Sequence, residues 1–175
     1  MEQTNSNVLY WSLLAHGEWE MILAATSEGL CFVGSINQPL DELKKWSESK
    51  LPHYELRKDD TELLPYINEF KEYFKGKLKH FTIPVDLRGT AFQCSVWNIL
   101  RDLPYGTTHS YSEIANIAEN SKAVRAVAAA IGANPLLIMI PCHRVIGKNG
   151  ALTGYRGGLA MKEKLLELEK KNIGA

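Results

Sequence analysis

The first third of the chain alternates apolar segments with polar turn residues, a pattern typical of an antiparallel β-meander. The apolar segments cover residues 8–14, 19–25 and 30–33, and short turns at His16-Gly17 and Ser27-Glu28-Gly29 separate them. Glycine-containing turns between such segments favour tight reversals of the chain, so three consecutive antiparallel strands are expected.

Two helices are predicted to follow this meander and to pack with it. The first covers residues 39–49, where Pro39 is tolerated because it falls in a first helical turn. The second covers residues 61–74 and is ended by Gly76. Residues 1–86 are therefore predicted to form a small domain of strands and helices, with a supporting role.

Helix signals dominate the second half of the chain. The segments Thr90–Gln93 and Ser110–Glu113 both fit a capping box, in which the first side chain caps the helix and the fourth reaches back. The first helix is expected to end at Leu103-Pro104 and the second at Ala118. Residues 87–175 are predicted to form a second, mainly helical domain, and the whole chain an α/β protein of α+β organisation.

A third helix over residues 122–131 completes a candidate helix-turn-helix. Ser121 is expected to cap it and Gly132 to stop it, and residues 119–121 form the turn that separates it from the preceding helix. Its inner face is apolar, whereas its outer face carries small residues and two cations: Lys122, Arg125, Ala129 and Gly132. An ordinary solvated helix has the same pattern, so this face alone leaves its function open.

Charge and composition narrow the class of protein. Among 175 residues, 20 Lys and Arg balance 20 Asp and Glu, so bulk attraction to polyanions is excluded and DNA binding would need a local surface. The sequence contains no membrane-span pattern and its N-terminus lacks the shape of a signal peptide, which predicts a soluble cytoplasmic protein. The three cysteines and five histidines show no disulfide or metal-ligand spacing, so no metal is expected.

Cys142 is the strongest candidate for chemistry. The apolar run at residues 136–140 is predicted to be a buried strand, and it leads directly into Pro141-Cys142-His143-Arg144. An imidazole beside a thiol can bring the thiolate into range at neutral pH, provided that a turn after Pro141 brings the two together. Cys31 and Cys94 lie in ordinary strand and helix patterns, so they are expected to be inert.

Glu169 is a candidate third member of this group. It lies on the apolar side of the last predicted helix, residues 159–171, because it follows Leu165 and Leu166 at helical spacing. A carboxylate on the buried side needs a partner, and an imidazole that acts as a base works best when a third group orients it. The alternative is an exposed carboxylate at a frayed helix end.

These residues belong to a longer pattern that resembles the O6-alkylguanine-DNA alkyltransferases, also called methylated-DNA–protein-cysteine methyltransferases. The resemblance is dense over residues 86–171 and present in outline before them. The motifs that carry it, in chain order, are Gly89-Thr90, Phe92-Gln93, Val96-Trp97, Leu100, Leu103-Pro104, Gly106, Thr108, Ser110-Tyr111, Arg125-Ala126-Val127, Asn134-Pro135, Pro141-Cys142-His143-Arg144-Val145, Gly154-Tyr155 and Gly157-Gly158-Leu159.

The resemblance implies a ribonuclease H-like N-terminal domain, a C-terminal winged helix-turn-helix domain, and repair of O6-alkylguanine by a single-use transfer. It makes Cys142 the alkyl acceptor, with His143 taking the thiol proton through a water and Glu169 holding His143. Tyr111 is implied to donate to guanine N3, and Asn134 to brace the turn around the acceptor. No cofactor is implied.

The resemblance also implies how DNA is held. The partner is double-stranded DNA, the protein acts as a monomer, and the target nucleotide is flipped out of the helix. Arg125 is implied to fill the vacated stack. The carbonyls of Cys142 and Val145 meet the exocyclic amine of guanine, and the amides near Tyr155 and Arg156 meet O6. Further residues implied to face DNA are Lys122, Ala123, Ala126, Ala129 and Ser110.

Four positions depart from the family pattern. Ala128 replaces a usual glycine on the side facing DNA, and Ile131 and Ala133 replace residues that are often polar or basic. Leu137 replaces a proline that lines the pocket, so the range of accepted alkyl groups stays open, as does activity on O4-alkylthymine.

Three rival functions are weighed against alkyl transfer. A non-reactive damage sensor would have another residue at position 142, so Cys142 argues against it. A winged-helix regulator would not require Tyr111, Arg125, Asn134 and Glu169 together. Nothing in the sequence indicates the acyl-transfer pocket that a cysteine hydrolase needs.

Overall fold

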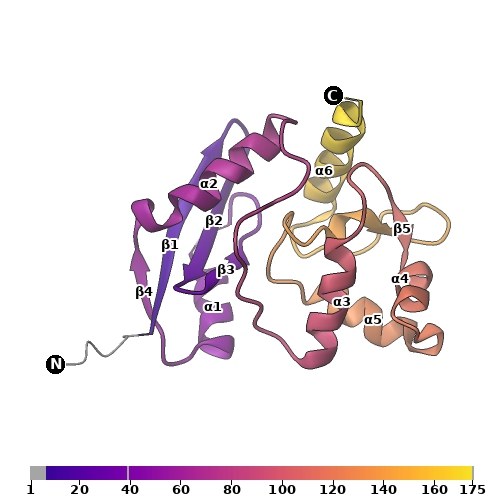
Figure 1. Ribbon diagram of the computed structural model, residues 1–175, viewed down its shortest axis with the longest axis horizontal. Coiled ribbons are helices and arrows are strands. Elements are labelled where there is room, and N and C mark those ends of the chain that lie inside the picture. Colours follow the sequence, from indigo (N-terminus) through magenta and orange to yellow (C-terminus); the bar gives the residue numbers. More distant parts are fainter. Residues whose placement is uncertain (1–6, 39, 175) are drawn as a thin grey trace.

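A four-stranded sheet forms the centre of the N-terminal part. The computed structural model describes residues 7–38 and 40–174 of the chain. Strands β1 (Val8–His16), β2 (Trp19–Thr26) and β3 (Gly29–Val33) pair antiparallel, which confirms the predicted meander. The fourth strand, β4, lies at the other edge of the sheet, so the strand order is β3-β2-β1-β4 (Figure 1).

The predicted meander does not include this fourth strand, and the sheet is therefore not antiparallel throughout. Strand β4 (Glu55–Lys58) runs parallel to β1, with Val8 opposite Glu55 and Trp11 opposite Lys58. Apart from the half-buried Leu56, its residues are polar and exposed, so hydrophobic alternation does not mark it. Main-chain pairing to the free edge of β1 holds it in place, and a sequence pattern does not reveal that pairing.

The two helices of this part cover opposite faces of the sheet. Helix α1 (Asp41–Lys50) packs Leu43 into a small cluster on one face, whereas α2 (Asp60–Phe74) packs Leu63 and Phe70 against the other. Predicted residue Pro39 lies outside the described residues, and α1 begins after it. Helix α2 is capped by Asp59, whose carboxylate accepts from the amide of Glu62 at 3.0 Å. Gly76 follows α2 with φ of 75°, as expected for a helix stop.

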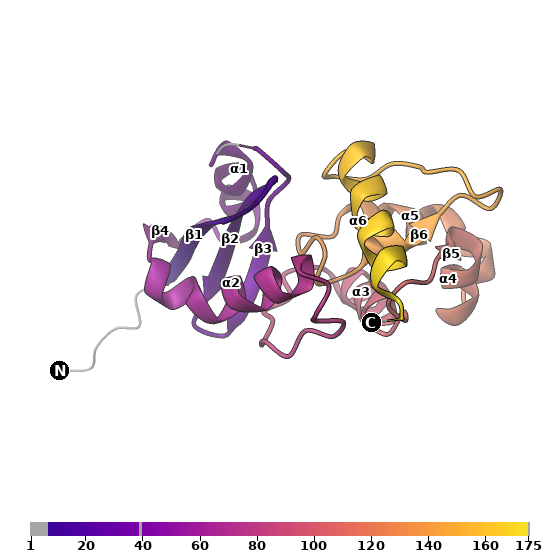
Figure 2. The same ribbon diagram turned by 90° about the horizontal axis from the view of Figure 1, so that it is seen from above.

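The C-terminal part is mainly helical, as predicted. Helices α4 and α5 form the helix-turn-helix, and a two-stranded parallel sheet of β5 and β6 lies beside them as the wing (Figures 1 and 2). In chain order its elements are α3 (Ala91–Arg101), β5 (His109–Ser110), α4 (Tyr111–Ile117), the 3₁₀ turn η1 (Ser121–Ala123), α5 (Val124–Gly132), the 3₁₀ turn η2 (Cys142–Arg144), β6 (Val145–Ile146) and α6 (Leu159–Asn172).

The predicted helix starts are confirmed for α3 and α4. Thr90 and Gln93 form a complete capping box at α3. At α4 the Ser110 hydroxyl accepts from the amide of Glu113 at 3.1 Å, but the Glu113 carboxylate contacts His109 Nδ1 rather than reaching back.

The predicted start of the third helix is wrong, whereas its end lies within one residue of the prediction. Ser121 does not cap α5, because it opens the turn η1 and α5 begins three residues later at Val124. Gly132 is the last residue of α5 rather than a left-handed stop, and the amide of Ala133 still bonds back to Ala129. The tight turn before η1 is made by Glu119, which has φ of 56°.

One hydrophobic cluster runs through both parts of the chain. It joins Leu23 of β2 and Phe70 of α2 with Trp97 of α3 and Leu165 of α6. The connection along residues 75–90 pairs with β3, where the Leu30 amide donates to Pro84 and the Asp86 amide donates to Leu30. The two lobes seen in Figure 2 therefore share a core. Every helix within the described ranges is too short or too polar to cross a lipid bilayer.

Candidate active site at Cys142

The segment before Cys142 is a braced turn, and the prediction of a buried strand at residues 136–140 is wrong. Asn134 is buried, and its side chain accepts from the Leu136 amide at 2.9 Å and donates to the Ile140 carbonyl at 2.8 Å. Leu136 makes a single bridge to Val33 of β3, after which the chain reverses. The apolar run marks burial correctly, but burial alone does not distinguish a strand from a packed turn.

Two tight reversals within this turn set the direction of the acceptor. The Met139 amide donates to the Leu137 carbonyl at 2.8 Å across Ile138, which has φ of 73°. That is a γ-turn of the rare positive-φ kind, and it is strained for a β-branched residue. The Cys142 amide then donates to the Ile140 carbonyl at 2.7 Å across Pro141. Strain of this kind persists when surrounding contacts over-determine it, and here Asn134 supplies them.

Cys142 is buried at the start of η2, with 6% of its surface exposed. Burial raises the pKa of its thiol, and a hydrogen bond from Asn134 and the charges of Arg156 and Lys162 partly oppose that effect. The resting group is therefore a thiol, so a nucleophilic role requires a nearby base.

His143 follows Cys142 directly in the chain and is the candidate base for its thiol. It is fully buried, and its Nε2 lies 2.5 Å from Glu169 Oε2. Because an ionised carboxylate only accepts, Nε2 carries the proton and Nδ1 is the basic nitrogen. Among the described residues, Nδ1 has no hydrogen-bond partner. Burial lowers the pKa of His143 despite the opposing effect of Glu169, which keeps the ring neutral and able to accept a proton.

Glu169 is 1% exposed, which excludes the alternative of a frayed surface carboxylate. Its two oxygens accept from His143, from the buried guanidinium of Arg144 and from the amide of Gly106. Tyr73 also donates to it. Burial alone would raise the pKa of Glu169, but the hydrogen bonds from His143 and Arg144 and the charge of Arg144 hold it well below its ordinary value.

A cavity of about 330 Å³ opens above the thiol. Such a volume is within the range of small-ligand sites. It brings together residues from α4, α5, the acceptor turn and the connection between β6 and α6. Its walls are Tyr111, Ala128, Ile131, Gly132, Asn134, Leu137, Cys142, Gly147, Thr153, Gly154, Tyr155 and Arg156. Thr153 donates to the hydroxyl oxygen of Tyr111 at 2.9 Å, which leaves the Tyr111 proton available to another acceptor.

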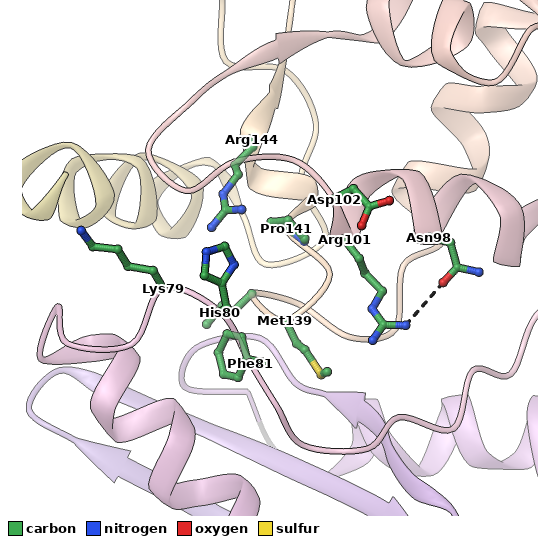
Figure 3. Close-up of a pocket in the computed structure, with 10 residues that line it drawn as sticks. Lys79, His80, Phe81, Asn98, Arg101, Asp102, Met139, Pro141 and Arg144 are labelled. Atoms are coloured by element: carbon green, nitrogen blue, oxygen red, sulfur yellow. Dashed lines mark hydrogen bonds between the residues drawn. The ribbon is translucent and has the colours of Figure 1, made fainter.

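A second cavity, of about 390 Å³, lies behind the acceptor turn (Figure 3). Met139 and Pro141 line it from the turn, and the guanidinium of Arg101 lies 3.4 Å from Asn98 at its edge. Its walls do not include Cys142 or His143, so a group bound there does not reach the thiol.

The outer face of α5 flanks the mouth of the first cavity. Three residues of α5 that are expected to face DNA are exposed here, namely Arg125, Ala126 and Ala129, and so is Lys122 in the preceding turn η1. Ala123 and Ser110 are half-buried, and the Ser110 hydroxyl is already used as the α4 cap. Ala128 and Gly132 follow Arg125 at helical spacing and line the cavity. The small side chains therefore lie between the arginine and the acceptor.

Two predicted contact residues have other bonds in the structure. The Arg156 side chain links the two lobes: it donates to the carbonyls of Val33, Asn134 and Pro135, forms an ion pair with Glu42, and lies over the ring of Phe32. The Val145 carbonyl accepts from Lys162 Nζ at 2.6 Å.

Sequence reasoning missed three polar residues of the site. Lys162 is fully buried, and its spacing from Leu165 and Glu169 on α6 was a usable signal. Arg144 lies inside the recognised tetrapeptide, so its partner could have been sought. Nothing in the sequence marks Tyr73 as a site residue, because an apolar helix face accommodates a tyrosine as readily as a phenylalanine. Within the part of the chain that is described, no group of three His, Cys, Asp or Glu side chains could hold a metal ion.

Fold and site together define a class of protein: a helix-turn-helix domain that carries a buried thiol, with an adjacent histidine base, at the floor of a cavity beside its exposed helix. Comparisons with known proteins agree. Residues 9–87 match the family described as 6-O-methylguanine DNA methyltransferase, ribonuclease-like domain, and residues 91–171 match its DNA binding domain. The chain belongs to this family.

Individual relatives are similar over nearly the whole chain. An inducible methylated-DNA–protein-cysteine methyltransferase of Bacillus subtilis is 56% identical, over 97% of this chain and 94% of the relative. One from Methanosarcina mazei is 40% identical, over 94% and 99%. The crystal structure of Mycobacterium tuberculosis OGT in complex with DNA superposes with a TM-score of 0.80 at 37% identity, over 93% of this chain and 94% of that one. The resemblance inferred from the motifs is confirmed.

Proposed function

We propose that this chain repairs DNA by transferring the alkyl group of O6-alkylguanine to Cys142, once per molecule. The observation that carries the proposal is the position of Cys142 in the wall of a cavity that α5 also lines, with His143 next in the chain and bonded to Glu169. A buried thiol with a neutral imidazole beside it suits a nucleophile that is activated only when a substrate fills the site.

The first step of this proposal is extrusion of the damaged nucleotide. O6 of guanine is not accessible inside a duplex, so the nucleotide must be flipped into the cavity. Flipping costs a few kcal/mol, and a side chain that takes the place of the lost base offsets part of that. Arg125 is exposed on α5, and the alanine and glycine residues next to it let DNA approach closely.

The second step is the transfer itself. The Cys142 proton passes to His143 Nδ1 through a water, and Glu169 stabilises the imidazolium that forms. The sulfur then attacks the alkyl carbon, so that a carbon–sulfur bond forms as the carbon–oxygen bond breaks. Negative charge develops on the departing purine, and Tyr111 stabilises it by donating to N3.

The product explains why the protein is used once. S-alkylcysteine is a thioether without a leaving group that water can displace, so the acceptor is not regenerated. No cofactor enters these steps, because the acceptor is the chain's own sulfur. One chain contains Cys142, His143 and Glu169 together, which supports action as a monomer. All three cysteines are free thiols, which suits a reducing compartment such as the cytoplasm.

The test is an intact-mass measurement. The protein is incubated with excess duplex carrying one O6-methylguanine, and the expected result is a gain of one methyl per chain that then stops. Cys142→Ser should abolish the gain, whereas Cys94→Ser should retain it, because Cys94 lies on α3 away from the cavity walls. Tight binding with unchanged mass would instead indicate a damage sensor, and continuous turnover would contradict a single-use acceptor.

A further inference from the structure

The carboxylate of Glu169 accepts hydrogen bonds from the N-terminal part of the chain as well as from the C-terminal part, to which it belongs. The Tyr73 hydroxyl, at the end of α2, donates to Glu169 Oε2 at 2.6 Å. The same oxygen accepts from His143 Nε2 at 2.5 Å and from Arg144 Nη2 at 3.1 Å. Tyr73 and His143 therefore share one acceptor atom. Among the described residues, Tyr73 is the one donor that residues 1–86 contribute to this carboxylate.

The position of the Tyr73 hydroxyl is fixed by its surroundings. The side chain is fully buried, and its ring makes aromatic contacts with Phe74, Phe81 and Tyr105. Burial and the negative charge of Glu169 both raise the pKa of Tyr73, so its hydroxyl stays protonated throughout the pH range in which the protein works. Within the described ranges its proton has no second acceptor, so the hydroxyl is a constant donor to Glu169.

We propose that Tyr73 is a positioning residue that sets the proton affinity of His143 through their shared acceptor on Glu169. This inference rests on the proposed alkyl transfer and assigns the N-terminal domain a direct part in it. A donor on Oε2 draws carboxylate charge away from the imidazole, so the imidazolium that forms during transfer is stabilised less strongly. Tyr73 thereby tunes the base, and it ties Glu169 to the neighbouring domain.

Other charged groups near His143 and Glu169 also affect the proton affinity of His143. Arg144 and Lys162 both act on His143, and both disfavour its charged form. On the Glu169 side, the Tyr105 ring lies beneath the Arg144 guanidinium at 5.5 Å, and the Lys79 ammonium lies 5.6 Å from the same ring. These groups stay in place when only the Tyr73 hydroxyl is removed.

The decisive variant is Tyr73→Phe, which removes the hydroxyl and keeps the ring. Methyl transfer is measured under single-turnover conditions with saturating O6-methylguanine duplex, from mildly acidic to alkaline pH. Without the competing donor the carboxylate stabilises the imidazolium more, so the thiolate forms at lower pH. The midpoint of the pH–rate profile should move down by about half a pH unit, a part of what one hydrogen bond to a charged group contributes.

Two controls separate this role from packing. Tyr66→Phe removes a hydroxyl from the same helix at a half-buried site without contact to Glu169, and its midpoint should equal that of the unaltered protein. In a Glu169→Gln background, Tyr73→Phe should produce no further shift, because the charge through which it acts is gone. A lower rate with an unmoved midpoint, or a shift that persists in the Glu169→Gln background, would overturn the proposal.

A second substitution covers the case in which Tyr73→Phe does not fold. Replacing Tyr73 by difluorotyrosine keeps the shape and strengthens the donor, so the midpoint should move in the opposite direction, to higher pH. A shift to lower pH, or none, would count against the proposal. If the unaltered protein gains no methyl at all, the proposed function itself fails. If it does gain methyl and no Tyr73 variant moves the midpoint, this inference alone fails.

Discussion

Replacing Asn134 by alanine tests whether the brace in the acceptor turn is as important as its geometry indicates. Asn134→Ala removes both side-chain hydrogen bonds that span the turn. The Ile140 carbonyl keeps a partner, because the Cys142 amide also donates to it at 2.7 Å. The Leu136 amide loses the one partner that the structure gives it and remains buried.

The expected loss of stability follows from what happens to the Leu136 amide and to the Ile140 carbonyl. Leaving the Leu136 amide unsatisfied costs about 1–3 kcal/mol, and losing the bond to Ile140 costs about 1 kcal/mol more. The expected loss of unfolding free energy is therefore about 2–4 kcal/mol. The strained γ-turn at Ile138 is also released. Because the hydrogen bond from Asn134 lowers the pKa of Cys142, its removal should raise the thiol pKa and slow methyl transfer at neutral pH.

Urea unfolding and single-turnover methyl transfer together check this prediction. The matched control is Asn98→Ala, which lies exposed on α3 and has one long contact to Arg101. The control should leave both the unfolding midpoint and the transfer rate within experimental error. A loss below about 0.5 kcal/mol for Asn134→Ala, comparable with an ordinary surface change, would refute the reasoning.

Three further substitutions have expected outcomes. Arg125→Ala should slow repair of duplex DNA more than reaction with free O6-benzylguanine, since only the duplex requires flipping, and equal losses would contradict that role. Glu169→Gln should move the midpoint of the pH–rate profile upward and slow transfer at neutral pH, and an unchanged profile would show that Glu169 does not stabilise the imidazolium. Folding lowers the pKa of Glu169, so its contribution to stability is complete above the pKa of the unfolded state and declines as the pH falls below that value. The thermal unfolding midpoints of the unaltered protein and of Glu169→Gln should therefore converge in acid. Thr90→Ala should lower stability by about 1 kcal/mol through loss of the α3 cap, which chemical denaturation would detect.

Local patterns in the sequence predicted the elements whose causes are local. The three strands of the meander follow from apolar segments between glycine turns, and the α3 and α4 starts follow from Thr90 and Ser110. The buried position of Glu169 follows from its spacing along α6. In each case residues within a few positions of one another determine the structure.

Features that depend on partners far away in the chain were not predictable in this way. Strand β4 has a single apolar residue, Leu56, and it forms by pairing with the free edge of β1. Residues 136–140 look like a strand in the sequence, but a single side chain, Asn134, bridges them into a turn. The bonds of Arg156 to Val33 and Glu42 and of Tyr73 to Glu169 each join positions about a hundred residues apart, and one sequence carries no record of such pairings.

The hydrophobic cluster shared by the sheet and α6 has a consequence for how much damage a cell can repair. Because Leu23 and Leu165 belong to one cluster, the two lobes are expected to unfold in a single transition. A reusable enzyme compensates for a smaller folded fraction by turning over more often, but a single-use acceptor does not. A core substitution in the sheet, remote from Cys142, therefore lowers repair capacity in proportion to the loss of folded molecules. The rate constant of each molecule that remains folded is unchanged.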